Sequence, residues 1–154
     1  MTYITPKEYL YSQFNVLPYY MALLLVPVNQ NLDYDFPWGR DLLTAPVPAK
    51  ETVLNIPMMP PIAGLVFLSA IIAVGVFFFV KTQKAPSSYK RIVAFFIFWF
   101  FIILSPTSSV VPIIDVIYEH RLYLPSLGFF VILVLAIDSL AGLIMKEKTK
   151  VPAE

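Results

Sequence analysis

One short segment between two apolar stretches concentrates most of the residue types that could do chemistry. It contains, in order, Asp115, Tyr118, Glu119, His120, Arg121 and Tyr123. An arginine at a membrane edge could pair through two N–H groups with a phosphate or diphosphate, and Glu119 could orient that arginine or transfer a proton. The alternative is that these side chains only extend from the apolar stretches toward water. The residue types alone leave both interpretations open.

Metal binding has one further candidate position. The segment NQNLDYDFPW places Asp33 and Asp35 one residue apart, and two carboxylates can bind a divalent cation. The commoner role of such a pair is a solvated turn, which the nearby proline and glycine favour. His120 is the one histidine of the chain and has no second nitrogen ligand, which argues against a metal role for it.

Asp138 is an acidic residue inside the last apolar stretch. A carboxylate in hydrocarbon is costly, so this side chain must face protein or water. Because it lies toward the lysine-rich end of the stretch, away from Arg121, a hydrogen bond that packs helices together is favoured over a role in catalysis. Four glycines could also allow helices to approach closely: Gly64, Gly75, Gly128 and Gly142.

Three apolar stretches must position these residues, and we expect each to cross a hydrocarbon core, which takes about 20 residues. The sequence predicts membrane helices over about 61–80, 92–105 and 126–145. Ser126 follows Pro125 and is a candidate N-cap for the last helix.

A fourth membrane segment is expected over about 13–28, where prolines at positions 18 and 27 interrupt the apolar run. A tilted crossing, a re-entrant hairpin and an interfacial helix all fit a stretch of this kind. The five tyrosines of the N-terminal region suit a membrane-interface belt; they are Tyr3, Tyr9, Tyr11, Tyr19 and Tyr20.

The composition indicates lipid as the solvent. The chain has 154 residues, of which 58% are hydrophobic and 14% charged, whereas soluble domains carry about 25% charged residues. The net charge of +1 gives the chain no positive field of the kind that binds nucleic acid. The absence of cysteine excludes disulfides and thiolate chemistry. We therefore expect an all-α, polytopic membrane helix bundle of three to four segments, forming one domain over 1–154 with long irregular outer loops.

Loop charge predicts the orientation of this bundle. Residues 81–91 contain four basic residues and no acid, and the tail after Met145 contains three lysines and two glutamates. Short basic loops stay on the cytoplasmic side, so the segments 29–60 and 106–125 are expected outside. The prediction is an integral membrane protein with a cytoplasmic C-terminus.

The segments SPTSSVVPIIDVIYEHRLYLPSLGF and QFNVLPYYMALLLVPVNQNLDYDFP resemble the transmembrane and tetratricopeptide-repeat O-mannosyltransferase family and its bacterial relatives. The resemblance extends roughly over 9–145, and EHRLYLPSLG is its most specific part. That family belongs to the GT-C glycosyltransferases, which take a sugar from a polyprenyl-phosphate carrier on the extracytoplasmic face. The resemblance implies that Glu119, Arg121 and Tyr123 line or brace the donor site, with His120 in the same string, and that the membrane is a bacterial inner membrane.

The chain also departs from the family. GT-C enzymes typically have many more membrane helices and a catalytic acid in their first outer loop, and this family carries helical repeats after its membrane domain. Nothing in this chain corresponds to those parts, so it resembles the C-terminal part of a membrane domain. The resemblance thus implies a second membrane protein that completes the domain, and it assigns no catalytic residue here.

Three functions follow as hypotheses. The first is the membrane part of a glycosyltransferase that uses a polyprenyl-phosphate sugar, incomplete on its own. The second is a noncatalytic small membrane subunit that binds a lipid-linked sugar or partner proteins. A transporter or channel component ranks last, because polar residues do not recur through several of the apolar stretches.

Overall fold

The chain folds, in a computed structural model, into helices alone over the part that the structure describes. The described residues are 4–27, 36–47, 58–84, 88–109, 111–112 and 116–148, and the side chains of residues 147 and 148 are not described. The helices are α1 (Pro6–Leu25), α2 (Pro61–Lys81), α3 (Tyr89–Leu104), the short 3-10 helix η1 (Glu119–Leu122) and α4 (Tyr123–Lys148). The expected all-α class is confirmed.

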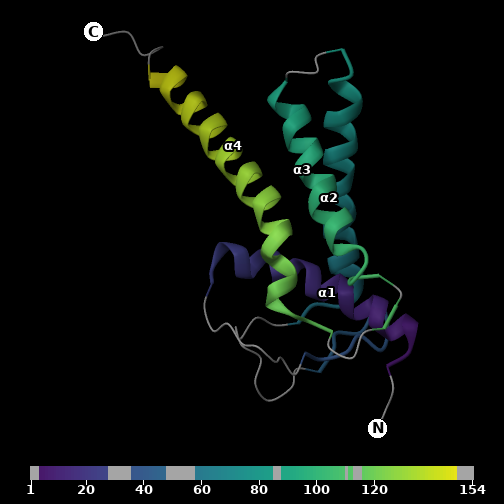
Figure 1. The fold of residues 1–154 in the computed structure, drawn as a ribbon. Helices are drawn as coiled ribbons and strands as arrows, with labels where there is room; N and C mark the ends of the chain where they lie inside the picture. The colour runs from purple at the N-terminus through teal and green to yellow at the C-terminus, as the bar shows by residue number, and fades with distance from the viewer. Residues whose placement is uncertain are drawn as a thin grey trace.

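Three helices extend from one end of the molecule, and α1 lies across that end (Figure 1). The described irregular segments 36–47, 58–60, 105–109, 111–112 and 116–118 gather there with η1, and we call this end the loop end. In the bundle, α3 contacts both α2 and α4. The connection between α2 and α3 lies at the opposite end, together with the C-terminal part of α4 (Figure 1). Of the basic residues expected on one side of the membrane, the described ones Lys81, Lys84, Lys90, Arg91 and Lys146 therefore share one end of the molecule.

Two helical stretches are long and apolar enough to cross a membrane, namely Pro61–Lys81 with 21 residues and Glu119–Lys146 with 28. Most of their residues are exposed, whereas a core helix of a soluble protein would be buried. Helix α3 has 16 residues. At 1.5 Å per residue it is about 24 Å long, compared with a hydrocarbon core of about 30 Å.

The start of α4 differs from the sequence-based expectation. The helix begins at Tyr123, so that Pro125 lies in its first turn. A proline is tolerated there because the N–H groups of a first turn have no helical partner in any case. Ser126 is consequently not the N-cap; its hydroxyl donates to the Tyr123 carbonyl over 2.7 Å.

Helix α1 begins earlier than predicted, after a capping box. The Thr5 hydroxyl accepts from the Glu8 N–H over 3.3 Å, and the Glu8 carboxylate accepts from the Thr5 N–H over 2.9 Å. The Thr5 hydroxyl also donates to this carboxylate over 2.7 Å, and the hydrogen bonds from the Thr5 N–H and hydroxyl hold the pKa of Glu8 below its usual value. The helix then continues through Pro18 and ends at Leu25, two residues before the second proline.

Pro18 of α1 and Gly64 of α2 fit together where the two helices cross. Because proline has no N–H, the Phe14 carbonyl cannot receive the α-helical hydrogen bond from position 18. Gly64 lies against this carbonyl, and a Cβ on Gly64 would be only 1.9 Å from the Phe14 oxygen. The missing side chain therefore lets the backbones of α1 and α2 approach each other directly.

The expectation of close helix approach is confirmed at two more glycines. A Cβ on Gly75 of α2 would lie 3.0 Å from Ile97 of α3, and one on Gly128 of α4 would lie 3.1 Å from the Phe96 carbonyl oxygen of α3. Gly142 of α4 differs, because nothing lies within 4 Å of the corresponding point.

We predict that Gly64→Ala lowers the thermal stability of the purified protein in mild detergent. The added methyl group meets backbone that cannot rotate away, and overpacking of this kind costs about 1–3 kcal/mol. Gly142→Ala is the matched control and should melt at the wild-type temperature or slightly above it. Equal melting temperatures for the two variants would show that the contact between α1 and α2 does not limit stability.

Candidate functional site

The string around Arg121 lies at the loop end, on η1 and the first residue of α4. Its side chains point in different directions. Glu119 and Arg121 are half-buried and His120 is exposed, while Tyr123 is 88% exposed. The structure thus keeps the charged pair of the string partly shielded and leaves Tyr123 at the surface.

Aromatic side chains surround the Arg121 guanidinium. Its central carbon lies 4.9 Å from the centre of the Tyr118 ring, and its Nη1 atom is shielded from solvent. Burial raises the pKa of Tyr9, and raises that of Tyr20 to about 12, while the charge and hydrogen bonding of Arg121 offset part of both rises. Arg121 therefore lies beside both phenols, and we call these four residues the tyrosine–arginine cluster.

Helix α1 holds the backbone on which Arg121 sits. The Tyr20 hydroxyl donates to the Tyr118 carbonyl over 2.9 Å and accepts from the Tyr118 N–H over 2.7 Å. The Tyr9 hydroxyl donates to the Thr107 carbonyl over 2.6 Å, and the Gln13 amide donates to the Val116 carbonyl over 3.1 Å. The three α1 side chains recur at helical spacing and share one face, so a single helix face fixes the chain leading into η1.

The same helix also holds the other irregular segments at the loop end. The Ser12 hydroxyl accepts from the Gly39 N–H over 2.9 Å, and the Asn15 amide donates to the Met59 carbonyl over 3.2 Å. Both of these α1 side chains, Ser12 and Asn15, are buried. Helix α1 is therefore the common support of the loop end.

The expected interface role of Tyr9 and Tyr20 is wrong. Both are completely buried, and their hydroxyls donate to the backbone carbonyls of Thr107 and Tyr118. Tyr11 and Tyr19 are half-buried, and Tyr3 lies outside the described residues. The spacing of Tyr9, Gln13 and Tyr20 on one helix face was the available signal, because polar groups aligned in this way can bond one neighbouring segment.

His120 extends the aromatic surface of the cluster. Its ring centre lies 4.8 Å from that of Tyr118, at an interplanar angle of 38°. Within the described residues no group of three histidine, cysteine, aspartate or glutamate side chains could hold a metal ion. The predicted cation ligands Asp33 and Asp35 lie outside the described residues, as does Asp115.

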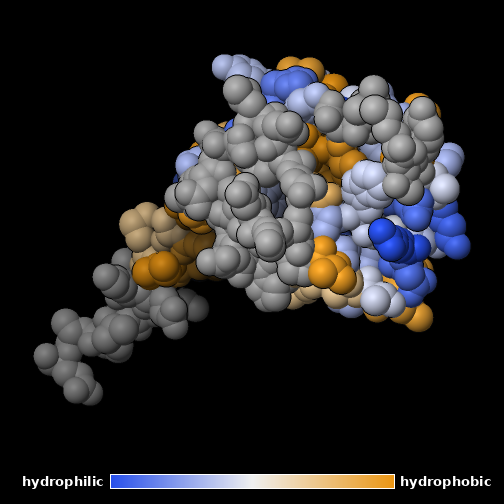
Figure 2. Space-filling model, turned by 90° about the horizontal axis from the view of Figure 1, so that it is seen from below, coloured by the Kyte–Doolittle hydropathy of each residue, from blue (hydrophilic) through white to orange (hydrophobic). Residues whose placement is uncertain are grey.

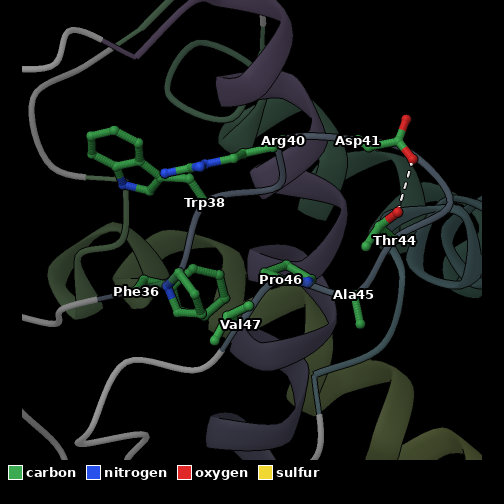
Figure 3. A pocket seen from close by; sticks show the side chains of 9 residues that line it. Phe36, Trp38, Arg40, Asp41, Thr44, Ala45, Pro46 and Val47 are labelled. Carbon is green, nitrogen blue, oxygen red and sulfur yellow. Dashed lines mark hydrogen bonds between the residues drawn. The ribbon is translucent and has the colours of Figure 1, made fainter.

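The loop end also carries an open pocket of about 460 Å³. Figure 2 shows this end of the molecule, where hydrophilic residues gather on one side and apolar side chains are exposed elsewhere. In Figure 3 the Arg40 side chain extends toward Trp38, whereas Asp41 points to Thr44. The Thr44 hydroxyl donates to the Asp41 carboxylate over 3.1 Å, and this bond is the largest cause that holds the pKa of Asp41 below its usual value. Arg121 does not line this pocket, so the pocket is separate from the tyrosine–arginine cluster.

Asp138 lies on the part of α4 that extends away from the loop end (Figure 1). Its side chain is exposed, and no hydrogen bond to it is found among the described residues. Helix α4 diverges from α2 and α3 at this point, and the helix-packing hydrogen bond expected for Asp138 stays a prediction.

No protein family, curated protein or solved structure matches the chain. The chemistry of the cluster is consequently argued from its own geometry. A half-buried guanidinium held by aromatic rings is a preorganised cation that can bind an anionic group. Since burial raises the pKa of Tyr9 and Tyr20, both phenols stay protonated at neutral pH and can donate hydrogen bonds but not act as bases.

We predict that Tyr20→Phe destabilises the protein by about 1–3 kcal/mol, because it leaves the buried N–H and carbonyl of Tyr118 without their partner. Thermal unfolding in detergent measures the effect. Tyr11→Phe is the control, since no hydrogen bond of the Tyr11 hydroxyl to a described residue is found and its ring contacts survive the change. A wild-type melting temperature for Tyr20→Phe would contradict the role assigned to α1.

Proposed function

We propose that the chain is the membrane part of a GT-C-like glycosyltransferase that uses a polyprenyl-phosphate-linked sugar, and that Arg121 binds the donor phosphate. The observation that carries the proposal is the environment of Arg121. Its guanidinium is half-buried against the Tyr118 ring and beside the phenols of Tyr9 and Tyr20. The resemblance of EHRLYLPSLG to the O-mannosyltransferase family points to the same residue.

The place of Arg121 along the chain suits a lipid phosphate. Helix η1 leads directly into α4, so the guanidinium lies at the start of a long apolar helix. A polyprenyl chain dissolves in the hydrocarbon core, and its phosphate stays at the surface of that core. The cation and the phosphate would therefore meet at the same depth.

The proposed topology has α2, α3 and α4 crossing the membrane, with the loop end outside and α1 at the outer surface. Lys81, Lys84, Lys90, Arg91 and Lys146 belong to the opposite end, which the positive-inside rule assigns to the cytoplasm. Helix α3 packs between two helices that are long enough to cross. Its shorter length is compatible with local thinning of the bilayer.

In the proposed reaction an acceptor hydroxyl attacks the anomeric carbon of the donor sugar, and the bond from that carbon to the phosphate oxygen breaks. Arg121 would stabilise the negative charge on the departing phosphate. The proton of the acceptor needs a base, which neither Tyr9 nor Tyr20 supplies at neutral pH. Glu119 could orient Arg121, and the family resemblance implies that a second membrane protein brings the acidic residue whose carboxylate accepts this proton as the base.

A noncatalytic subunit that binds a lipid-linked sugar is the second candidate. It is favoured by Tyr9 and Tyr20, whose raised pKa values keep both phenols protonated, which suits the holding of a headgroup without chemistry. The two candidates differ in one respect: the first requires sugar transfer that depends on Arg121 once the partner is present, whereas the second requires binding alone.

We predict that Arg121→Gln weakens the binding of polyprenyl phosphate to the protein in lipid nanodiscs by roughly 10- to 100-fold, the loss expected for one hydrogen-bonded charge. Arg121→Lys keeps the charge but loses the planar guanidinium that lies over the Tyr118 ring. Its affinity for polyprenyl phosphate should therefore fall between those of the wild type and Arg121→Gln. Titration with a fluorescent polyprenyl phosphate measures all three.

Arg40→Gln is the matched control, because Arg40 is an exposed cation of the loop end outside the cluster. Its affinity should equal that of the wild type. An equal loss for Arg40→Gln, or equal competition by phosphatidic acid, would show general attraction of anionic lipid instead of a donor site. The melting temperature of each variant separates lost binding from lost folding.

A further inference from the structure

Helix α4 leaves the bundle partway along its length. Near its start, Gly128 lies against α3, and the Trp99 indole N–H donates to the Leu124 carbonyl over 3.2 Å. From residue 136 to residue 146 every side chain is exposed. Figure 1 shows α4 diverging from α2 and α3 toward its C-terminal end. The first half of α4 is thus a packed helix, and the second half is an apolar helix whose side chains are exposed.

Asp138 lies within this exposed half. At 1.5 Å per residue it is about 22 Å from Tyr123 and about 12 Å from Lys146 along the helix axis. An aspartate side chain is too short to reach water across such distances, in contrast to the long side chains of lysine and arginine. Carboxylates at this depth generally face a protein partner or a water-filled cavity. The exposed half of α4 therefore carries a group that lipid solvates poorly.

Gly142 supplies a second observation on the same face, one helical turn after Asp138. The other three helix glycines all lie where another helix backbone or side chain comes close, at Gly64, Gly75 and Gly128. Gly142 is the exception among them, since open space surrounds it. Its neighbour Ala141 is also small and exposed. This face therefore has the shape that lets a helix approach closely, next to the group that needs a polar partner.

We propose that the face of α4 around Asp138, Ala141 and Gly142 docks a membrane helix of a second protein, which carries a lysine, arginine or amide side chain at the depth of Asp138. Charge complementarity selects this occupant. The basic residues of helices α2, α3 and α4 lie at the helix ends, at Lys81, Lys90, Arg91, Lys146 and Lys148. A second copy in the same orientation would bring no described cation to the depth of Asp138.

This docking face stands apart from the tyrosine–arginine cluster, which lies at the loop end. The inference uses only burial, helix geometry and the cost of a carboxylate in lipid. It does not depend on sugar transfer or on phosphate binding by Arg121, so either proposal can fail without the other.

Site-specific photo-cross-linking of the full chain in its native membrane tests the docking face. A benzophenone amino acid replaces Ala141, and the control replaces Val76, which is exposed on α2 at a similar height above the loop end. Mass spectrometry then identifies the residue that each cross-linker has captured.

We expect position 141 to cross-link to a transmembrane segment of another protein with a lysine, arginine, asparagine or glutamine within one helical turn of the captured residue. Asp138→Leu should reduce this cross-link at least fivefold without lowering the melting temperature, and Gly142→Ile should reduce it similarly by blocking close approach. Adducts with lipid alone, capture of a second copy of this chain, a partner segment without such a side chain, or an undiminished cross-link in Asp138→Leu would each overturn the proposal.

Discussion

The loop end depends on one physical requirement, which is that irregular backbone beside apolar helices must find hydrogen-bond partners. Helix α1 meets this requirement with polar side chains that bond to backbone N–H and carbonyl groups of these segments. Its polar face bonds to the chain at Thr107, Val116 and Tyr118, and other positions of the same helix bond to the segments around Gly39 and Met59. The described irregular segments of the loop end are therefore held by a helix that lies across this end of the bundle.

The contact between α1 and α2 shows how two unfavourable residues for a helix can support each other. Pro18 removes a hydrogen bond from α1, and Gly64 lacks a side chain to pack. Together they let the two backbones meet at the Phe14 carbonyl. Because α2 then packs on α3, and α3 on α4, this contact links the support at the loop end to the rest of the bundle.

The candidate site could be predicted in part from the sequence. Glu119, His120 and Arg121 are adjacent in the chain, so their proximity needs no tertiary information. The role of Tyr9 and Tyr20 could not be predicted, because their partners lie 98 residues away and an amphipathic tyrosine suits an interface equally well. The start of α4 was also misjudged, since a proline is compatible both with a position before a helix and with its first turn.

The sequence by itself determined the apolar helices, their approximate ends and the separation of basic residues from the Arg121 segment, because hydrophobicity, proline placement and charge act locally along the chain. Only the tertiary structure decided that α1 lies across the bundle, that two of its tyrosines are buried against a distant backbone, and that α4 carries Asp138 out of the bundle. These outcomes depend on which surfaces meet. Hydrogen bonds and close packing between segments far apart in the chain settle that question, and no local pattern encodes their geometry.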